Sequence, residues 1–423
     1  MVYQPPTGAR DLLPLDVAQK RWIEERLQQV FHRWGYHRII TSTLERLDTL
    51  MAGGAVQRST VIQVQDTEDE MLGLRPELTA SIARAAVTRM AGATYPHRLY
   101  YNANVFRRSS PSSYSRQQEF YQAGVELLGG SGLVADAEIV LLLAACLSSL
   151  GLSQSQAVSN SGSQPGGSWH LVLGEAGLTQ SLLSPFPPNI RNQVREAIAH
   201  LDRITLETLP LSTELRERAL FLLDLRGQPA QVLQQVASLD LDLSQRAALN
   251  NLKSLVDLLH DSFSHQSGPS PLILDLSLIQ TFDYYTGIVF EVVSDTEVGQ
   301  RVLGQGGRYD QLLGLYHPQG QTHSGIGFVL NIENLHQVLL PTGQLPNCTP
   351  ASDWLVVPET PQAFAAAFAY AQKLRESPDL VRVEVDLGER DASESVHEYA
   401  RRRCISQIAW IQAAGSPKIE RLT

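Results

Sequence analysis

A Leu-rich helical block interrupts a strand-rich pattern in this chain, and that interruption limits the folds that it can adopt. Patterns typical of strands occur at residues 37–44, 61–64, 72–75, 98–106 and 118–128, and they resume at 272–275, 288–293 and 325–330. From about residue 169 to 264 the apolar residues recur at helical spacing, which indicates a helical insertion. Further helices are expected at 16–34, where Asp16 can cap the first turn, and at 78–90 and 136–149. The sequence therefore predicts an α+β fold.

The last segment follows a stretch at 341–350 whose prolines and glycine are typical of a linker. Strand patterns at 354–357, 381–387 and 405–411 alternate there with helical patterns at 360–374 and 392–403. Alternation of this kind favours a small parallel sheet. We therefore expect two domains, residues 1–340 with the helical insertion at about 169–264, and a small C-terminal α/β domain at 351–423 that is shortened by about one helix.

Composition argues against several kinds of site and partner. The three cysteines, Cys146, Cys348 and Cys404, lie far apart and form neither a zinc-binding pattern nor a disulfide framework. Neither a run of about 18 apolar residues nor a signal-peptide pattern occurs, so we expect a cytoplasmic protein without a membrane span. The net charge is −10, whereas a nucleic-acid binder usually presents a basic face.

Four short motifs are candidates for a functional site, and each is weak by itself. Residues 7–14 form a turn-rich start, 74–80 runs from a strand into a helix, and 283–287 precedes a strand. The sequence GQGGRYD at 304–310 predicts a tight glycine turn, because glycine lets the backbone approach a ligand closely. Their order and spacing are more specific than any one motif.

Together the motifs resemble the histidyl-tRNA synthetase family of class II aminoacyl-tRNA synthetases over nearly the whole chain. The three class motifs fall at residues 35–45, 106–122 and 325–335, and the two histidine-specific signatures are DYYTG at 283–287 and GGRYD at 306–310. The resemblance implies a large antiparallel sheet with flanking helices, a dimer, and a pocket for histidine, ATP and Mg²⁺. It also implies that residues 351–423 are a truncated anticodon-binding-like domain.

The resemblance assigns candidate histidine-binding residues. Glu77 and Gln122 match positions that hold the amino group, and Glu126 and Tyr285 match positions around the imidazole. A carboxylate and a phenol can satisfy both ring nitrogens, while an ammonium prefers carboxylate and amide oxygens. The alternative is a vestigial cleft that binds nothing. The complete candidate set is Glu77, Thr79, Arg107, Gln122, Glu126, Tyr284, Tyr285 and Arg308.

The chain departs from the synthetase pattern where adenylate formation needs positive charge. Gln280 stands where an arginine precedes the DYYTG signature, and Asn334 stands where the third class motif ends in arginine. Ser109 replaces a glutamate of the second motif, and Ser42 replaces a proline of the first. Losing one preorganised donor costs about 2.7–4 kcal/mol, so losing two would slow the reaction about 10⁴–10⁶-fold. We therefore expect no catalytic residues, no cofactor and no metal.

The C-terminal segment also departs from an RNA-binding domain. Residues 351–423 contain nine Lys and Arg against eleven Asp and Glu, a net charge of −2. Contacts to phosphate dominate the affinity of proteins for nucleic acids. The basic run at 401–403 is better explained as a helix end whose arginines complement the helix dipole. This balance argues against tRNA as a partner.

A synthetase-like chain that keeps the histidine-binding residues but lacks the arginines for adenylation resembles a second family. This family is the regulatory subunits of the short-form ATP phosphoribosyltransferase. That resemblance implies a non-catalytic protein that the catalytic subunit requires in the first step of histidine biosynthesis. It also implies a hetero-oligomer with a dimer of this chain at its core, and allosteric feedback by L-histidine. The alternatives are a divergent active histidyl-tRNA synthetase, and a synthetase-like protein that serves another carrier or senses uncharged tRNA. Gln280, Asn334 and the acidic tail argue against the first alternative, and the sequence shows no basic face or extra domain for the second.

Overall fold

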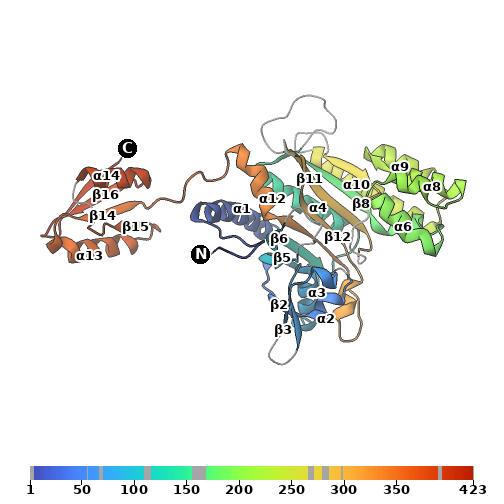
Figure 1. The fold of residues 1–423 in the computed structure, drawn as a ribbon, viewed down its shortest axis with the longest axis horizontal. Coiled ribbons are helices and arrows are strands. Elements are labelled where there is room, and N and C mark those ends of the chain that lie inside the picture. Colours follow the sequence, from blue (N-terminus) through green and yellow to red (C-terminus); the bar gives the residue numbers. More distant parts are fainter. Residues whose placement is uncertain are drawn as a thin grey trace. The chain divides into compact units, whose positions relative to one another are not determined.

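The computed structural model describes residues 4–54, 56–65, 70–108, 116–154, 168–264, 271–278, 285–296, 299–388 and 393–422 (Figure 1). The chain divides into two compact units. One comprises Met1–Leu13 and Gln19–Leu345, and the other comprises Pro14–Ala18 and Pro346–Thr423. Each unit has its own sheet and its own apolar core.

A ten-stranded sheet organises the first unit, and its central strands are antiparallel. They follow the order β5 (His97–Phe106), β6 (Glu119–Leu128), β13 (Gly325–Asn331), β12 (Gly299–Arg308), β11 (Ile288–Thr296) and β8 (Ser168–Glu175). The short strands β1 (His37–Arg38), β7 (Ser153–Gln154), β10 (Leu272–Asp275) and β9 (Arg226–Gly227) complete it. Strands from both sides of the helical block thus join one sheet, which confirms the predicted α+β fold with a large antiparallel sheet.

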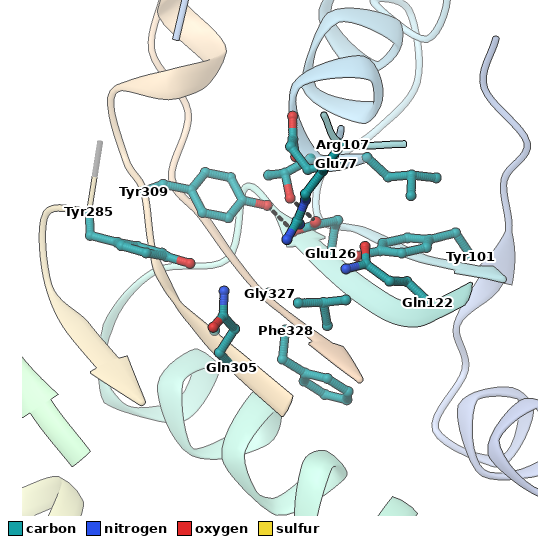
Figure 2. Close-up of a pocket in the computed structure, with 14 residues that line it drawn as sticks. Glu77, Tyr101, Arg107, Gln122, Glu126, Tyr285, Gln305, Tyr309, Gly327 and Phe328 are labelled. Atoms are coloured by element: carbon teal, nitrogen blue, oxygen red, sulfur yellow. Dashed lines mark hydrogen bonds between the residues drawn. The ribbon is translucent and has the colours of Figure 1, made fainter. Parts of the chain in front are cut away.

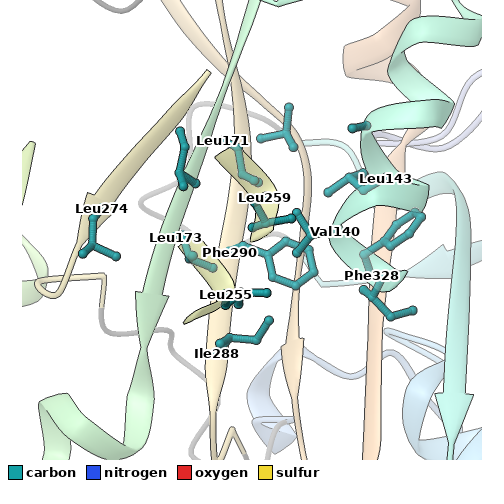
Figure 3. Packing of buried hydrophobic residues seen from close by; sticks show 14 of the residues in the cluster. Val140, Leu143, Leu171, Leu173, Leu255, Leu259, Leu274, Ile288, Phe290 and Phe328 are labelled. Atoms are coloured by element: carbon teal, nitrogen blue, oxygen red, sulfur yellow. The ribbon is translucent and has the colours of Figure 1, made fainter. Parts of the chain in front are cut away.

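One face of this sheet carries the main core. Helices α1 (Pro14–Arg33), α4 (Gly132–Ser149), α10 (Leu243–Ser264) and α12 (Ile332–Leu339) all contribute to it. Figure 3 shows Val140 and Leu143 of α4 near Phe290 and Phe328 of the sheet. Helix α4 is long and apolar enough to cross a membrane by composition, yet its buried side chains belong to this core. We therefore interpret α4 as a core helix.

The opposite face is covered by α3 (Thr79–Thr88) and α11 (Leu312–Tyr316), which pack against each other and on the sheet. Because side chains alternate along a strand, neighbouring residues of β5 point to opposite faces of the sheet. Tyr100 packs into the core with α1, whereas Tyr101 packs with α3. The α3 face carries the candidate site.

The segment predicted as one strand at 37–44 is not a single strand. Only His37–Arg38 pairs with β5, and the chain then crosses to a separate three-stranded sheet of order β2-β4-β3. The side chain of Arg75 bridges this crossing by donating to the carbonyls of Thr41 and Ser42 at 2.9 and 3.2 Å. The prediction was wrong because β-branched residues mark extended backbone without showing which sheet it joins. The elements here are β2 (Leu44–Arg46), α2 (Leu47–Met51), η1 (Arg58–Thr60), β3 (Gln63–Gln65) and β4 (Met71–Leu74).

The helical insertion begins later than predicted. Trp169, Leu171 and Leu173 are buried at alternate positions of β8, an interior strand of the large sheet, so the proposed start at 169 was wrong. The helices of the insertion are α5 (Ala176–Leu182), α6 (Pro188–Ala199), α7 (Arg203–Thr208), α8 (Thr213–Leu223), α9 (Pro229–Ala237) and α10.

The glycine-rich motif at 304–310 is not a tight turn, because residues 299–308 form strand β12. Its glycines are explained by close packing. A Cβ at Gly306 would lie 2.3 Å from the carbonyl oxygen of Gly327 and 2.7 Å from the ring of Phe290. A Cβ at Gly307 would lie 2.7 Å from the ring of Tyr285. The run therefore marks a strand that tolerates almost no side chain.

The second unit contains the predicted parallel strands and one strand that we did not predict. Parallel strands β15 (Val383–Val385), β14 (Trp354–Pro358) and β16 (Gln407–Ile411) are adjacent, with β17 (Pro417–Arg421) antiparallel at the edge. Helices α13 (Phe364–Arg375) and α14 (Ser393–Arg402) pack on different sets of strand residues. The 3₁₀ turns η2 (Leu340–Thr342) and η3 (Pro361–Ala363) precede β14 and α13. Strand β17 was missed because its residues are exposed and carry little apolar pattern.

We expect Gly306→Ala to destabilise the first unit by about 1–3 kcal/mol, as overpacking does in tight interiors. The added methyl group would meet backbone as well as the ring of Phe290. Urea unfolding followed by circular dichroism measures the change. Gly92→Ala is the matched control, because nothing lies within 4 Å of a Cβ at that position. Equal stability of both variants would contradict the packing explanation.

Candidate functional site

A pocket opens on the α3 face of the large sheet (Figure 2). Strands β5, β6, β12 and β13 form its floor, and the start of α3 and the segments beside Arg107, Tyr285 and Tyr309 form its walls. The arrangement brings together residues that are more than 200 positions apart in the sequence. The lining residues are Glu77, Leu78, Thr79, Tyr101, Arg107, Gln122, Glu126, Tyr285, Gln305, Gly306, Tyr309, Gly327, Phe328 and Val329.

The carboxylate of Glu126 is the most buried charge-bearing group of the pocket. Its side chain is 2% exposed, and it accepts hydrogen bonds from the hydroxyls of Thr79, at 2.7 Å, and Tyr309. Burial raises the pKa of Glu126 from 4.5 to about 8. The negative charge of nearby Glu77 also raises this pKa, whereas the two hydrogen bonds lower it. Gly327 leaves room for the carboxylate, because a Cβ there would lie 2.0 Å from its Oε2.

A second carboxylate, that of Glu77, lies at the start of α3. It accepts from the backbone N–H of Ala80 at 3.0 and 3.3 Å, in the manner of a helix cap. Burial raises the pKa of Glu77, while hydrogen bonds and the charge of Arg107 act in the opposite direction. Arg107 is anchored by its Nε, which donates to the carbonyl of Pro76 at 2.9 Å. One guanidinium and two carboxylates therefore line this pocket.

Three polar groups of the lining have no hydrogen-bonding partner within the described ranges of the chain. They are the carboxamides of Gln122 and Gln305 and the hydroxyl of Tyr101. All three side chains line the pocket, so a bound ligand could pair with them. Burial also raises the pKa of Tyr101 well above 10, so its hydroxyl stays protonated and able to donate. The pocket thus offers both donors and acceptors to a small polar ligand.

The structure brings together six of the eight candidates from the sequence: Glu77, Thr79, Arg107, Gln122, Glu126 and Tyr285. Arg308 does not line the pocket. It lies next to Tyr309, and because neighbouring residues of a strand face opposite sides, its guanidinium pairs with Asp136 of α4 at 2.5 Å and with Asp310 at 3.1 Å. Tyr284, like Gln280 and Ser109, lies outside the described residues.

The sequence reasoning missed Tyr101, Gln305 and Tyr309. Tyr309 belongs to the GGRYD signature and could have been found by alternation from Arg308. Gln305 was hidden in a motif that we interpreted as a turn. Tyr101 lies in a correctly predicted strand, and only the pairing of β5 with β6 shows which face it serves.

Asn334, which stands in place of a motif arginine, does not line the pocket. Its carboxamide donates to the carbonyl of Val302 at 2.8 Å, and its backbone N–H donates to the side chain of Asn331 at 2.9 Å. The side chain therefore ties α12 to β12. Arg107 is the one cationic side chain among the described residues that line the pocket.

Comparison with known proteins identifies two levels of similarity. A family model described as histidyl-tRNA synthetase matches residues 8–335. Proteins named ATP phosphoribosyltransferase regulatory subunit match the full length. That of Nostoc punctiforme (strain ATCC 29133 / PCC 73102) is 69% identical over 422 residues, and that of Nostoc sp. (strain PCC 7120 / SAG 25.82 / UTEX 2576) is 68% identical over 423 residues. Each alignment covers 100% of this chain and 100% of the relative.

Solved structures share the fold. A crystal structure described as an ATP phosphoribosyltransferase regulatory subunit/histidyl-tRNA synthetase from Bacillus halodurans C has a TM-score of 0.77 at 25% identity and covers 97% of both chains. The histidyl-tRNA synthetase of Nostoc sp. PCC 7120 has a TM-score of 0.75 at 16% identity, covering 100% of this chain and 97% of that one. The chain is thus 68% identical to the regulatory subunit of that strain and 16% identical to its synthetase.

The raised pKa of Glu126 predicts a pH-dependent stability. The folded state favours the protonated carboxyl, so this stabilisation is complete below 4.5 and is lost as the pH rises through about 8. We expect the unfolding free energy to fall by about 3–5 kcal/mol between pH 4.5 and 8.5 on this account. Glu126→Gln should remove most of that fall, whereas Glu398→Gln, at an exposed surface carboxylate, should not. Urea unfolding across this pH range is the measurement, and identical pH profiles of wild type and Glu126→Gln would contradict it.

Proposed function

The chain belongs to the family of ATP phosphoribosyltransferase regulatory subunits, and we propose that it performs this role by binding L-histidine in the pocket around Glu126. The observation that carries the proposal is the buried Glu126 carboxylate with two hydroxyl donors, in a pocket whose amides have no partner among the described residues. A ligand with several polar groups of both kinds suits such a lining. Histidine has an imidazole, an ammonium and a carboxylate.

Tyr309 and Glu126 suit one nitrogen of the imidazole. The hydroxyl of Tyr309 donates to Glu126, and a phenol oxygen can also act as an acceptor, here for a ring N–H. Glu126 thereby fixes the orientation of Tyr309, as a buried network can when every member is satisfied. The sequence resemblance had placed Tyr285 in this role, and Tyr285 lines the same pocket.

The other end of the pocket suits the amino-acid backbone of the ligand. Glu77 and Gln122 offer oxygens to an ammonium, and Arg107 offers positive charge to a carboxylate. These groups come from the segment that leads into α3, from β6 and from the segment after β5, so the sheet helps to set the spacing between the two ends. This division supports a free amino acid as the ligand.

The competing reading is a divergent active histidyl-tRNA synthetase. Adenylation needs several cations around the phosphates of ATP, whereas Arg107 is the one cation of the lining in the part of the chain that the structure describes. Asn334 uses its side chain to hold α12 against β12. Gln280 and Asn334 therefore support a protein that does not catalyse adenylation.

We further propose the assembly that the family implies. The partner is a short-form ATP phosphoribosyltransferase catalytic subunit, this chain forms the dimer at the core of a cytoplasmic hetero-oligomer, and histidine acts as an allosteric effector. Allostery requires that histidine binds two states of the assembly with different affinity. The domain of residues 351–423 is an anticodon-binding-like domain that does not bind tRNA.

Two assays on the purified chain test the proposal. Calorimetric titration should show histidine binding in the wild type that Glu126→Ala abolishes, because the variant removes the acceptor at the centre of the network. Histidine-dependent exchange of pyrophosphate into ATP should be undetectable. Exchange would restore the synthetase reading, and unchanged histidine affinity in Glu126→Ala would move the binding site elsewhere.

Tyr309→Phe gives a finer prediction. The variant keeps the ring and removes one hydroxyl, so we expect histidine affinity to fall about 10-fold or more, since the deletion leaves Glu126 short of a donor. Tyr370→Phe on α13 is the control for loss of a tyrosine hydroxyl away from the pocket. The two affinities are measured by calorimetry. Retained affinity in Tyr309→Phe would exclude Tyr309 from the imidazole site.

A further inference from the structure

Strand β12 presents a single long side chain where it crosses the pocket. The glycines at 304, 306 and 307 surround Gln305. A Cβ at Gly304 would lie 2.8 Å from the carbonyl oxygen of Val329, and those at Gly306 and Gly307 would meet the rings of Phe290 and Tyr285. Packing therefore excludes side chains on both sides of Gln305 and leaves its own side chain to project from the strand.

Gln305 faces the same space as the proposed imidazole contacts. It pairs with Glu291 on one side and Val329 on the other, in the middle of the antiparallel sheet. Its side chain shares a face of β12 with Gly307, where Tyr285 packs, because side chains alternate along a strand. Figure 2 shows the carboxamide of Gln305 pointing into the pocket toward the space bordered by Tyr285 and Tyr309.

The carboxamide of Gln305 has no hydrogen-bonding partner among the side chains and backbone that the structure describes. A carboxamide carries both a donor and an acceptor, and a neutral imidazole carries one of each. If Tyr309 and Glu126 engage one ring nitrogen, a carboxamide on the same side of the pocket can satisfy the other nitrogen in either tautomer. A phenyl ring or an aliphatic chain of the same size would offer no hydrogen-bonding atom to the carboxamide of Gln305.

We propose that Gln305 is a specificity-determining residue, whose carboxamide binds the second imidazole nitrogen of the ligand. The inference rests on the proposed function, in which the first nitrogen contacts Tyr309 and Glu126. Gln305 thereby makes the pocket select an imidazole by both of its nitrogens. A site with buried hydrogen-bonding groups rejects ligands that lack the matching groups far more strongly than an apolar site does.

Calorimetry with L-histidine on the full chain tests this role. Gln305→Met keeps the length of the side chain and removes its polar atoms, so we expect affinity for histidine to fall about 10-fold. Gln300→Met is the matched control, because Gln300 is an exposed residue of the same strand and does not line the pocket. It should bind histidine within about twofold of the wild type. Thermal unfolding of both variants checks that the sheet is intact.

Binding of the two N-methylhistidine isomers is a second measurement. A variant that fails to fold would lose binding of both isomers and would not distinguish them. Each blocks one ring nitrogen, so both should bind the wild type poorly. Gln305→Ala opens space beside one nitrogen and should recover binding of one isomer and not of the other. Overturning results are a Gln305→Met affinity within twofold of the wild type, or equal responses of Gln305→Ala to both isomers. A wild type that does not bind histidine overturns the proposed function itself and this inference with it.

Discussion

The burial of one carboxylate, that of Glu126, constrains the rest of the site. Ionising a carboxyl group in an apolar interior is costly even where donors surround it. Here the donors are Thr79, the first residue of α3, and Tyr309, which directly follows β12. The register of β6 with β13 places Gly327 opposite Glu126, and that glycine leaves the space for the carboxylate. A helix, two strands and a glycine are thus positioned around a single side chain.

The antiparallel sheet explains how such distant residues meet. Side chains at alternate positions of β5 and β6 point to opposite faces of the sheet. On one face they pack into the core with α1 and α4, and on the other they lie on the side of α3 and the pocket. The first face supplies stability through a large apolar cluster, and the second face carries the polar groups that line the pocket. This division separates the residues that hold the fold from those that we propose bind the ligand.

Much of this arrangement could be predicted from the sequence, and the exceptions have physical reasons. The order of elements could be predicted because strand pattern and helix spacing are local properties, whereas the six candidate residues that line the pocket came from the family resemblance of the motifs. Arg308 and Tyr309 were confused because a shift of one residue changes the face of a strand. The glycines around Gln305 were interpreted as a turn, since glycine marks close packing as well as turns. The boundary at 169 and strand β17 depend on burial, which one sequence does not show.

The most direct test of the account is to reconstitute a short-form ATP phosphoribosyltransferase catalytic subunit with this chain or with its Glu126→Ala variant. The account predicts that both forms activate the catalytic subunit, and that histidine inhibits only the complex with the wild-type chain. Coupling of this kind requires a ligand that distinguishes two states of the complex. Equal inhibition of the two complexes by histidine would contradict the claim that the pocket around Glu126 is the histidine sensor.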